Sequence, residues 1–141
     1  MVLSIQGREQ GAAPAARGDA DRLIHDAHAR AVSATAAEMA VYLQDLFGQN
    51  LTALMAGIDH PKTVGRWARG QRPHPANLAR IRNAFHIATL LEPATSRQTV
   101  QSWFMGMNPH LDDRAPALVL ADEPDAAPRV MQAAHAFLAH G

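Results

Sequence analysis

Cysteine is absent from this chain of 141 residues, and aromatic residues are few: two tryptophans, one tyrosine and four phenylalanines. Without thiols the protein has no disulfide bond, no thiolate metal site and no thiol nucleophile. A chain without cysteine fits the reducing cytosol, where disulfides are rare, and we expect a cytoplasmic protein. The sequence therefore argues against a disulfide-stapled scaffold and against thiol chemistry.

Long apolar runs are also missing. No stretch approaches the roughly 18 apolar residues of a membrane span, and the N-terminus has no basic region followed by an apolar one. We therefore expect no membrane contact and no targeting segment. Strict alternation of apolar and polar residues, which is typical of β-strands, is missing too. Because much of the apolar content is alanine, the best helix former, the sequence predicts an all-α protein.

Acidic residues are missing from the middle of the chain. The formal net charge is zero, but no Asp or Glu occurs between His60 and Arg82, whereas Asp and Glu predominate after Asn108. A local field, and not the net charge, decides whether a phosphate backbone is attracted. The basic residues of this middle stretch are Lys62, Arg66, Arg69, Arg72, Arg80 and Arg82.

Helical periodicity predicts how the chain is organised. Residues 1–18 lack it and are expected to form a disordered arm. A capping box at Thr35-Ala-Ala-Glu38 and a stop at Gly48 mark a helical extension over residues 19–48. Residues 49–93 are expected to form a helix-turn-helix domain, and residues 94–141 a C-terminal helical region.

The stretch LTALMAGIDHPKTVGRWARGQ, residues 51–71, has the pattern of a helix-turn-helix. Its second helix is expected from about Pro61 to Arg69, since proline suits a first turn and Gly70 follows as a terminator. Two stripes divide this helix. The apolar stripe has the spacing i, i+3, i+4 and consists of Val64, Trp67 and Ala68. The basic stripe has the spacing i, i+4, i+7, with Thr63 beside it, and consists of Lys62, Arg66 and Arg69.

This division favours a recognition helix that buries Trp67 and faces DNA with its basic stripe. Arginine can read guanine bidentately, and lysine or arginine also neutralises phosphates. Arg72, Arg80 and Arg82 could extend the contact with the DNA backbone. One short helix gives little affinity, so a homodimer on paired half-sites is expected. The alternative is that the charges form an ordinary solvated face on a helical hairpin.

Two segments together resemble the helix-turn-helix proteins of the MbcA/ParS/Xre antitoxin family. The first is Pro61-Lys-Thr-Val-Gly-Arg-Trp-Ala-Arg-Gly70. The second is Val100-Gln-Ser-Trp-Phe-Met-Gly-Met-Asn-Pro109, followed by Leu111 and Arg-Ala-Pro-Ala-Leu118. The resemblance covers residues 45–141, and it depends on the order and spacing of both segments.

The resemblance implies an Xre-like helix-turn-helix core, an antitoxin that represses its own operon, and no enzymatic activity or cofactor. Its partner would be a toxin of the RES-domain type, which degrades NAD. In such complexes the C-terminal segment of the antitoxin lies at the active site of the toxin. The positions that the resemblance assigns to toxin binding are Trp103, Phe104, Asn108, Pro109, Leu111, Phe137, Leu138 and Gly141.

The residues alone leave two questions open. Trp103 and Phe104 are adjacent on a helix, so one could be buried while the other anchors a partner, or both could belong to the core. The function also has rivals, which are a stand-alone transcriptional repressor and a protein–protein adaptor whose helix-turn-helix has lost DNA binding.

Catalytic and metal-binding patterns are not found. The chain has eight histidines, but no HExxH motif and no cysteine or clustered carboxylate accompanies them, so no metal site is expected. No serine lies in a Gly-Xaa-Ser-Xaa-Gly elbow, and the glycines do not have the spacing of a phosphate loop. An enzyme is therefore not expected.

Overall fold

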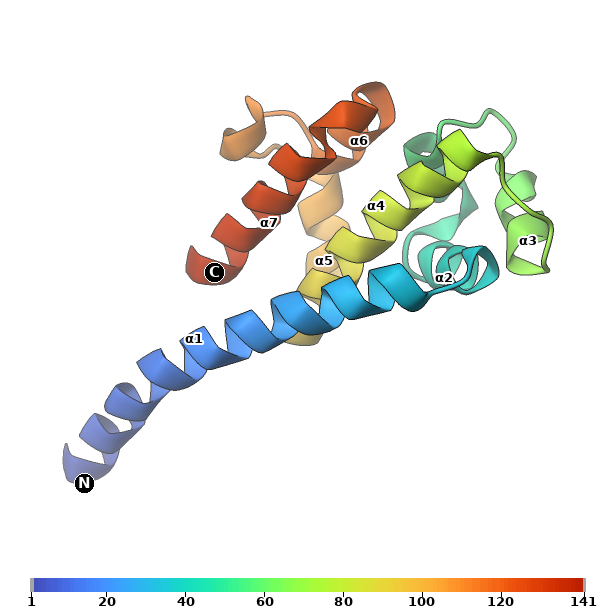
Figure 1. Ribbon diagram of the computed structural model, residues 1–141. Helices are drawn as coiled ribbons and strands as arrows, with labels where there is room; N and C mark the ends of the chain where they lie inside the picture. The colour runs from blue at the N-terminus through green and yellow to red at the C-terminus, as the bar shows by residue number, and fades with distance from the viewer. Residues whose placement is uncertain (1, 141) are drawn as a thin grey trace.

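The computed structural model of the chain describes residues 2–140, with side chains from residue 18 onward, and it is all-helical (Figure 1). The α-helices are α1 (Val2–Ser33), α2 (Ala36–Ala56), α3 (Lys62–Ala68), α4 (Pro75–Leu91), α5 (Arg97–Met105), α6 (Pro116–Asp122) and α7 (Ala127–His140). Short 3-10 helices are η1 (Glu92–Ala94), η2 (Pro109–Leu111) and η3 (Pro124–Ala126). The described residues form no strand, and their one isolated bridge pairs Asn108 with Arg114. The all-α prediction is confirmed.

The structure bears on two further predictions, the disordered N-terminal arm and the absence of a membrane-spanning segment. The predicted disordered arm, residues 1–18, falls almost entirely on residues outside the fully described part and stays a prediction. Within the described residues, none of the helices combines the length and the apolar content needed to span a bilayer.

α2 consists of two helical pieces that meet at Gly48. Its start is the predicted capping box: Thr35 Oγ1 accepts a hydrogen bond from the Glu38 N–H at 3.1 Å, and Glu38 Oε1 accepts one from the Thr35 N–H at 2.8 Å. The bond from the Thr35 backbone is the main reason that the pKa of Glu38 is lowered. At Gly48, φ is 83° and ψ is 166°, which is not helical. The chain therefore changes direction there, and the second piece ends at Ala56.

α4 is the central helix of the fold. It packs against α1, α2, α6 and α7, and Figure 1 shows it running through the middle of the molecule. Its side chains from Ile81 to Leu91 are mostly buried, among them Phe85 at 3% exposure. Covering α4 on several sides removes its apolar surface from water and holds the helices around it together.

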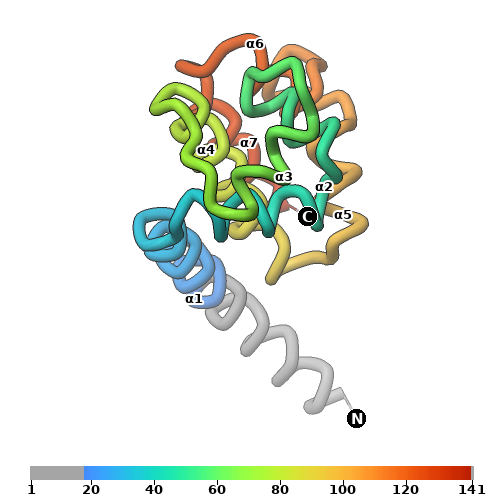
Figure 2. The backbone as a smooth tube through the Cα atoms, turned by 90° about the vertical axis from the view of Figure 1, so that its right-hand side faces the viewer, coloured from blue at the N-terminus to red at the C-terminus, as the bar shows by residue number. Residues whose placement is uncertain are grey.

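One cluster of buried side chains extends from Ala27 in α1 to Ala134 in α7. The predicted boundaries after residues 48 and 93 fall at the Gly48 kink and within η1, but the core is continuous across both. α3 lies at the right edge of Figure 1 and faces the viewer in Figure 2, whereas α7 ends on the opposite side. The two regions singled out from the sequence therefore point away from each other.

Candidate functional site

α3 is a short helix that is anchored by its apolar stripe. It begins after Pro61, whose φ of −56° already suits a helix. Val64 is fully buried and Trp67 is only 3% exposed, while Ala68 is half-buried. A helix of 7 residues is too short to be stable alone in water. The burial of Val64 and Trp67 against α2 is therefore what holds α3 in place.

Gly65 allows α3 to approach α2 closely. A Cβ placed on Gly65 would lie 2.9 Å from Nε2 of Gln49 and 3.9 Å from Oε1 of Gln44. These two glutamines lie on either side of the Gly48 kink and are joined by a hydrogen bond of 3.2 Å. The kink and the glutamine pair thus form the surface on which α3 rests.

The turn between α2 and α3 is fixed at its beginning by Gly57 and Asn77. Gly57 has a φ of 76°, a conformation that suits glycine, and its N–H donates to Ala53 and Leu54 carbonyls. Asn77 Nδ2, near the start of α4, donates to the Ala56 carbonyl at 2.8 Å. α2 and α3 are joined by a turn that starts at Gly57, and α4 holds that turn through Asn77. This order of elements agrees with the predicted one.

The basic stripe of α3 faces solvent, as predicted. Lys62, Arg66 and Arg69 are exposed, Arg72 in the following turn is exposed, and Thr63 beside them is half-buried. Within residues 18–140, none of the four cations forms a salt bridge, and none donates a side-chain hydrogen bond. Their charge is consequently free to act on an external anion.

The other arginines whose side chains are described have partners. Arg22, Arg97, Arg114 and Arg129 pair with carboxylates. Arg30 lies over aromatic rings, with its Cζ 5.8 Å from the centre of the Tyr42 ring. Among the arginines with described side chains, those elsewhere are neutralised or packed, so the unpaired ones belong to α3 and the turn that follows it.

Arg80 and Arg82, which were expected to extend the DNA contact, are half-buried and bind carbonyls within the fold. Arg80 donates to the Ala121 carbonyl at 2.7 Å, at the end of α6. Arg82 donates to the carbonyls of Ala31 and Ala34, at the end of α1. Both guanidinium groups satisfy carbonyls at helix C-termini, where a positive charge is favourable.

Half of the residues that the resemblance assigns to toxin binding are buried. Trp103 is 8% exposed and Phe104 is fully buried, so neither aromatic is free to anchor a partner. Their ring centres are 5.3 Å apart, and each also meets a ring from another element: Phe104 meets Phe47, and Trp103 meets Phe137. Of the two alternatives, the structure shows the one in which both are buried.

In the loop after α5, two of the assigned residues are also buried. Leu111 is buried, and Asn108 is 8% exposed, with its side chain accepting a hydrogen bond from the His110 N–H at 2.9 Å. Asn108 and Leu111 therefore shape the loop and do not reach outward. Pro109 is exposed, Phe137 and Leu138 are half-buried, and Gly141 lies outside the described residues.

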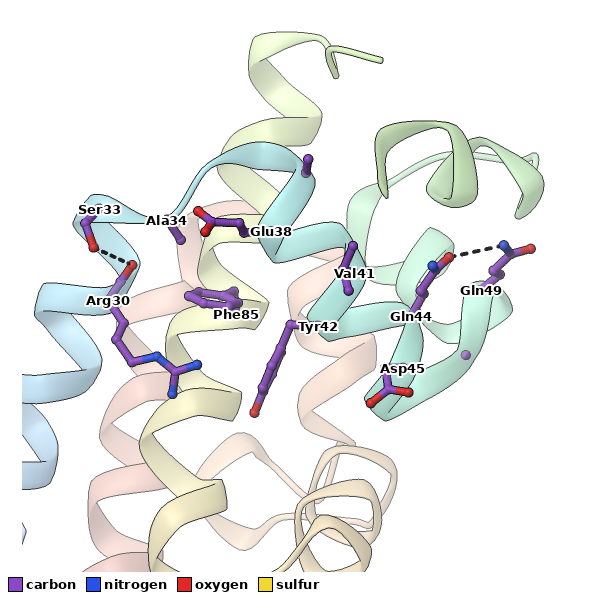
Figure 3. Close-up of a pocket in the computed structure, with 12 residues that line it drawn as sticks. Arg30, Ser33, Ala34, Glu38, Val41, Tyr42, Gln44, Asp45, Gln49 and Phe85 are labelled. Carbon is purple, nitrogen blue, oxygen red and sulfur yellow. Dashed lines mark hydrogen bonds between the residues drawn. The ribbon is translucent and has the colours of Figure 1, made fainter. Parts of the chain in front are cut away.

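A groove of about 1150 Å³ between α1, α2 and α4 was not anticipated from the sequence (Figure 3). Arg30 and Phe85 form one side, while Val41 and Gln44 lie on the α2 side. Tyr42 donates a hydrogen bond to Glu92. Burial is the main cause that raises the pKa of Tyr42, and the hydrogen bond to the Glu92 carboxylate raises it further. The residues that line the groove come from three helices, so only the tertiary fold brings them together.

Metal-binding geometry is not found among residues 18–140: no group of three or more His, Asp or Glu side chains there could hold an ion. Comparisons with models of protein families, with curated proteins and with solved structures found no match to this chain. The candidate interface therefore depends on its own geometry and charge.

Proposed function

We propose that this chain is a DNA-binding regulator of the antitoxin type, in which α3 enters the major groove of duplex DNA. The observation that carries the proposal is a set of four exposed, unpaired cations on an anchored helix and the turn that follows it: Lys62, Arg66, Arg69 and Arg72. Nucleic-acid affinity comes mainly from neutralising phosphates, and exposed unpaired cations do this without first breaking an internal ion pair.

The position of α3 supports the same proposal. Trp67 and Val64 fix its inner side, so the orientation of Arg66 and Arg69 is set before DNA arrives. Arg66 and Arg69 are one turn apart, which lets them contact bases or phosphates within one stretch of groove. Because α3 has only 7 residues, the proposal includes a homodimer on two half-sites.

The second part of the proposal is a toxin of the RES-domain type as the protein partner, and it depends on the family resemblance. Since Trp103 and Phe104 are buried, a partner would contact the surface around them: exposed Met105, Met107 and Pro109, or the half-buried end of α7. Met107 is 82% exposed, and methionine adapts well to protein interfaces. Figure 1 shows α7 ending on the side away from α3, so a duplex on α3 would leave that end uncovered.

Fluorescence anisotropy with a labelled mixed-sequence DNA duplex, over a range of salt concentrations, tests the first part. The variant Arg66→Ala/Arg69→Ala is expected to bind less tightly. Its salt slope should be flatter by about 0.9 for each phosphate that the variant no longer neutralises. The matched control is Arg22→Ala/Arg129→Ala, which removes the same charge from exposed arginines far from α3 and should keep the original slope.

Equal affinity and equal slope for both double variants would overturn DNA binding through α3 and favour the adaptor. Co-expression with a neighbouring RES-type gene separates the other alternative. An antitoxin should co-purify with that toxin and restore growth, whereas a stand-alone repressor would bind DNA and do neither.

A further inference from the structure

Three histidines from three different helices meet around one small cavity. His28 of α1, His86 of α4 and His135 of α7 line a space of about 190 Å³, together with Ile24, Leu90 and Met131. The rest of the lining is thus apolar. Among the residues whose side chains are described, no carboxylate lines the cavity, although the chain has as many acidic as basic residues. His86 and His135 are half-buried, and His28 is exposed.

The imidazoles are close enough to interact electrostatically. The ring centres of His28 and His86 are 5.7 Å apart. Burial lowers the pKa of His86 below its ordinary value of 6.5, and the nearby His28 and His135 lower it further. Two positive charges at this separation repel each other more strongly in a partly buried cavity than in water.

The charged groups around the cavity do not offset this repulsion. On α4, Arg82 is one turn before His86 and adds a further positive charge while it binds carbonyls at the end of α1. On α1, Asp21 and Asp26 are exposed, and neither forms a salt bridge within the described residues. On α7, Arg129 pairs with Asp112 and His140 is exposed at the end of the helix.

We propose that His86, held between His28 and His135, acts as a proton-sensitive latch that holds α1 and α7 on α4 while its imidazole is neutral and weakens both contacts when it becomes charged. In the docked state His86 is half-buried in a cavity whose described lining holds no carboxylate. In the released state its ring is hydrated and can be charged at no such cost. The latch concerns the docking of two helices and does not depend on whether α3 binds DNA.

The direction of the pH effect follows from proton linkage. Because the folded-state pKa of His86 is lowered, the released state takes up a proton first as the pH falls through about 6.5. Docking is therefore strongest above that pH and weakens below it, until the docked state is protonated as well. At pH 5.5, a His86 imidazole that is neutral when docked and charged when released raises the equilibrium constant for release by up to about tenfold.

Native-state amide hydrogen exchange of the full chain tests the latch, measured at pH 7.5 and pH 5.5 with a chelator present and corrected for intrinsic exchange. Opening of residues 24–33 of α1 and of the buried part of α7 should increase several-fold, up to about tenfold, at the lower pH, whereas α2 should change much less. His86→Gln keeps a polar side chain that does not titrate and should reduce the increase to about twofold or less. His135→Gln removes a neighbouring imidazole of His86 and should reduce the increase in part.

The control is His74→Gln, in the exposed turn before α4, which should behave as the unaltered chain does. Two results would overturn the latch. One is an unaltered chain whose α1 and α7 open no more at pH 5.5 than α2 does. The other is a full pH response in His86→Gln, which would place the titrating group elsewhere.

Discussion

Replacing Trp67 by alanine tests whether α3 is anchored as described. Trp67 is only 3% exposed and is the largest side chain that α3 contributes to the core. Truncating a buried tryptophan removes its transfer free energy and leaves a cavity, which costs about 3–5 kcal/mol. A domain of ordinary stability has about 5–15 kcal/mol in total, so we expect most Trp67→Ala molecules to remain folded.

The destabilisation should be concentrated in α3, because 7 residues cannot stay helical without tertiary support. Urea unfolding followed by circular dichroism gives the global free energy of unfolding, and hydrogen exchange shows where protection falls. Trp67→Phe keeps an aromatic ring and should be destabilised about half as much as Trp67→Ala. Met107→Ala, at an exposed position, should change stability by less than about 0.5 kcal/mol and serves as the control.

A destabilisation below about 1 kcal/mol for Trp67→Ala, with unchanged exchange in α3, would refute the argument. It would mean that this side chain does not hold the helix. The orientation of the neighbouring cations would then need another explanation.

Three further predictions concern the supports of the fold. Gly57→Ala should cost about 1–2 kcal/mol, measured by thermal unfolding, because φ is 76° and a Cβ would lie 3.0 Å from Arg80 Nε; an unchanged Tm would contradict this. Arg82→Met should destabilise α1 by about 1–3 kcal/mol, since two carbonyls would be left without their charged donor, and urea unfolding compared with Arg22→Met checks it. Thr35→Ala should cost about 1 kcal/mol because it removes the capping box, and Thr35→Ser should restore most of it.

Local features were predictable because local periodicity determines them. The buried Trp67, the exposed Arg66 and the turn at Gly57 all follow from spacings within about one turn of helix. The capping box at Thr35 follows from residue types at fixed positions. In each case the sequence and the structure agree because no distant contact competes.

Features that depend on distant contacts could not be predicted. Arg80 and Arg82 have carbonyl partners 41 and 51 residues away, and nothing near them in the sequence indicates those partners. Trp103 and Phe104 are both buried because α5 is covered on two sides: Phe104 meets Phe47, and Trp103 meets Phe137. Helical spacing within α5 cannot reveal that other helices cover both of its aromatic side chains.

The conformation of Gly48 sets the angle between the two helical pieces of α2. Its φ of 83° with ψ of 166° belongs to a region that is essentially reserved for glycine. The piece of α2 after Gly48 leads through the turn at Gly57 into α3, which carries the basic side chains. α3 packs on residues from both pieces of α2, among them Gln44 before the kink and Gln49 after it, so the angle at Gly48 shapes the surface that supports the basic side chains. A side chain at Gly48 would strain this backbone conformation whatever the space around it, so one substitution could disturb that support without removing any of the cations.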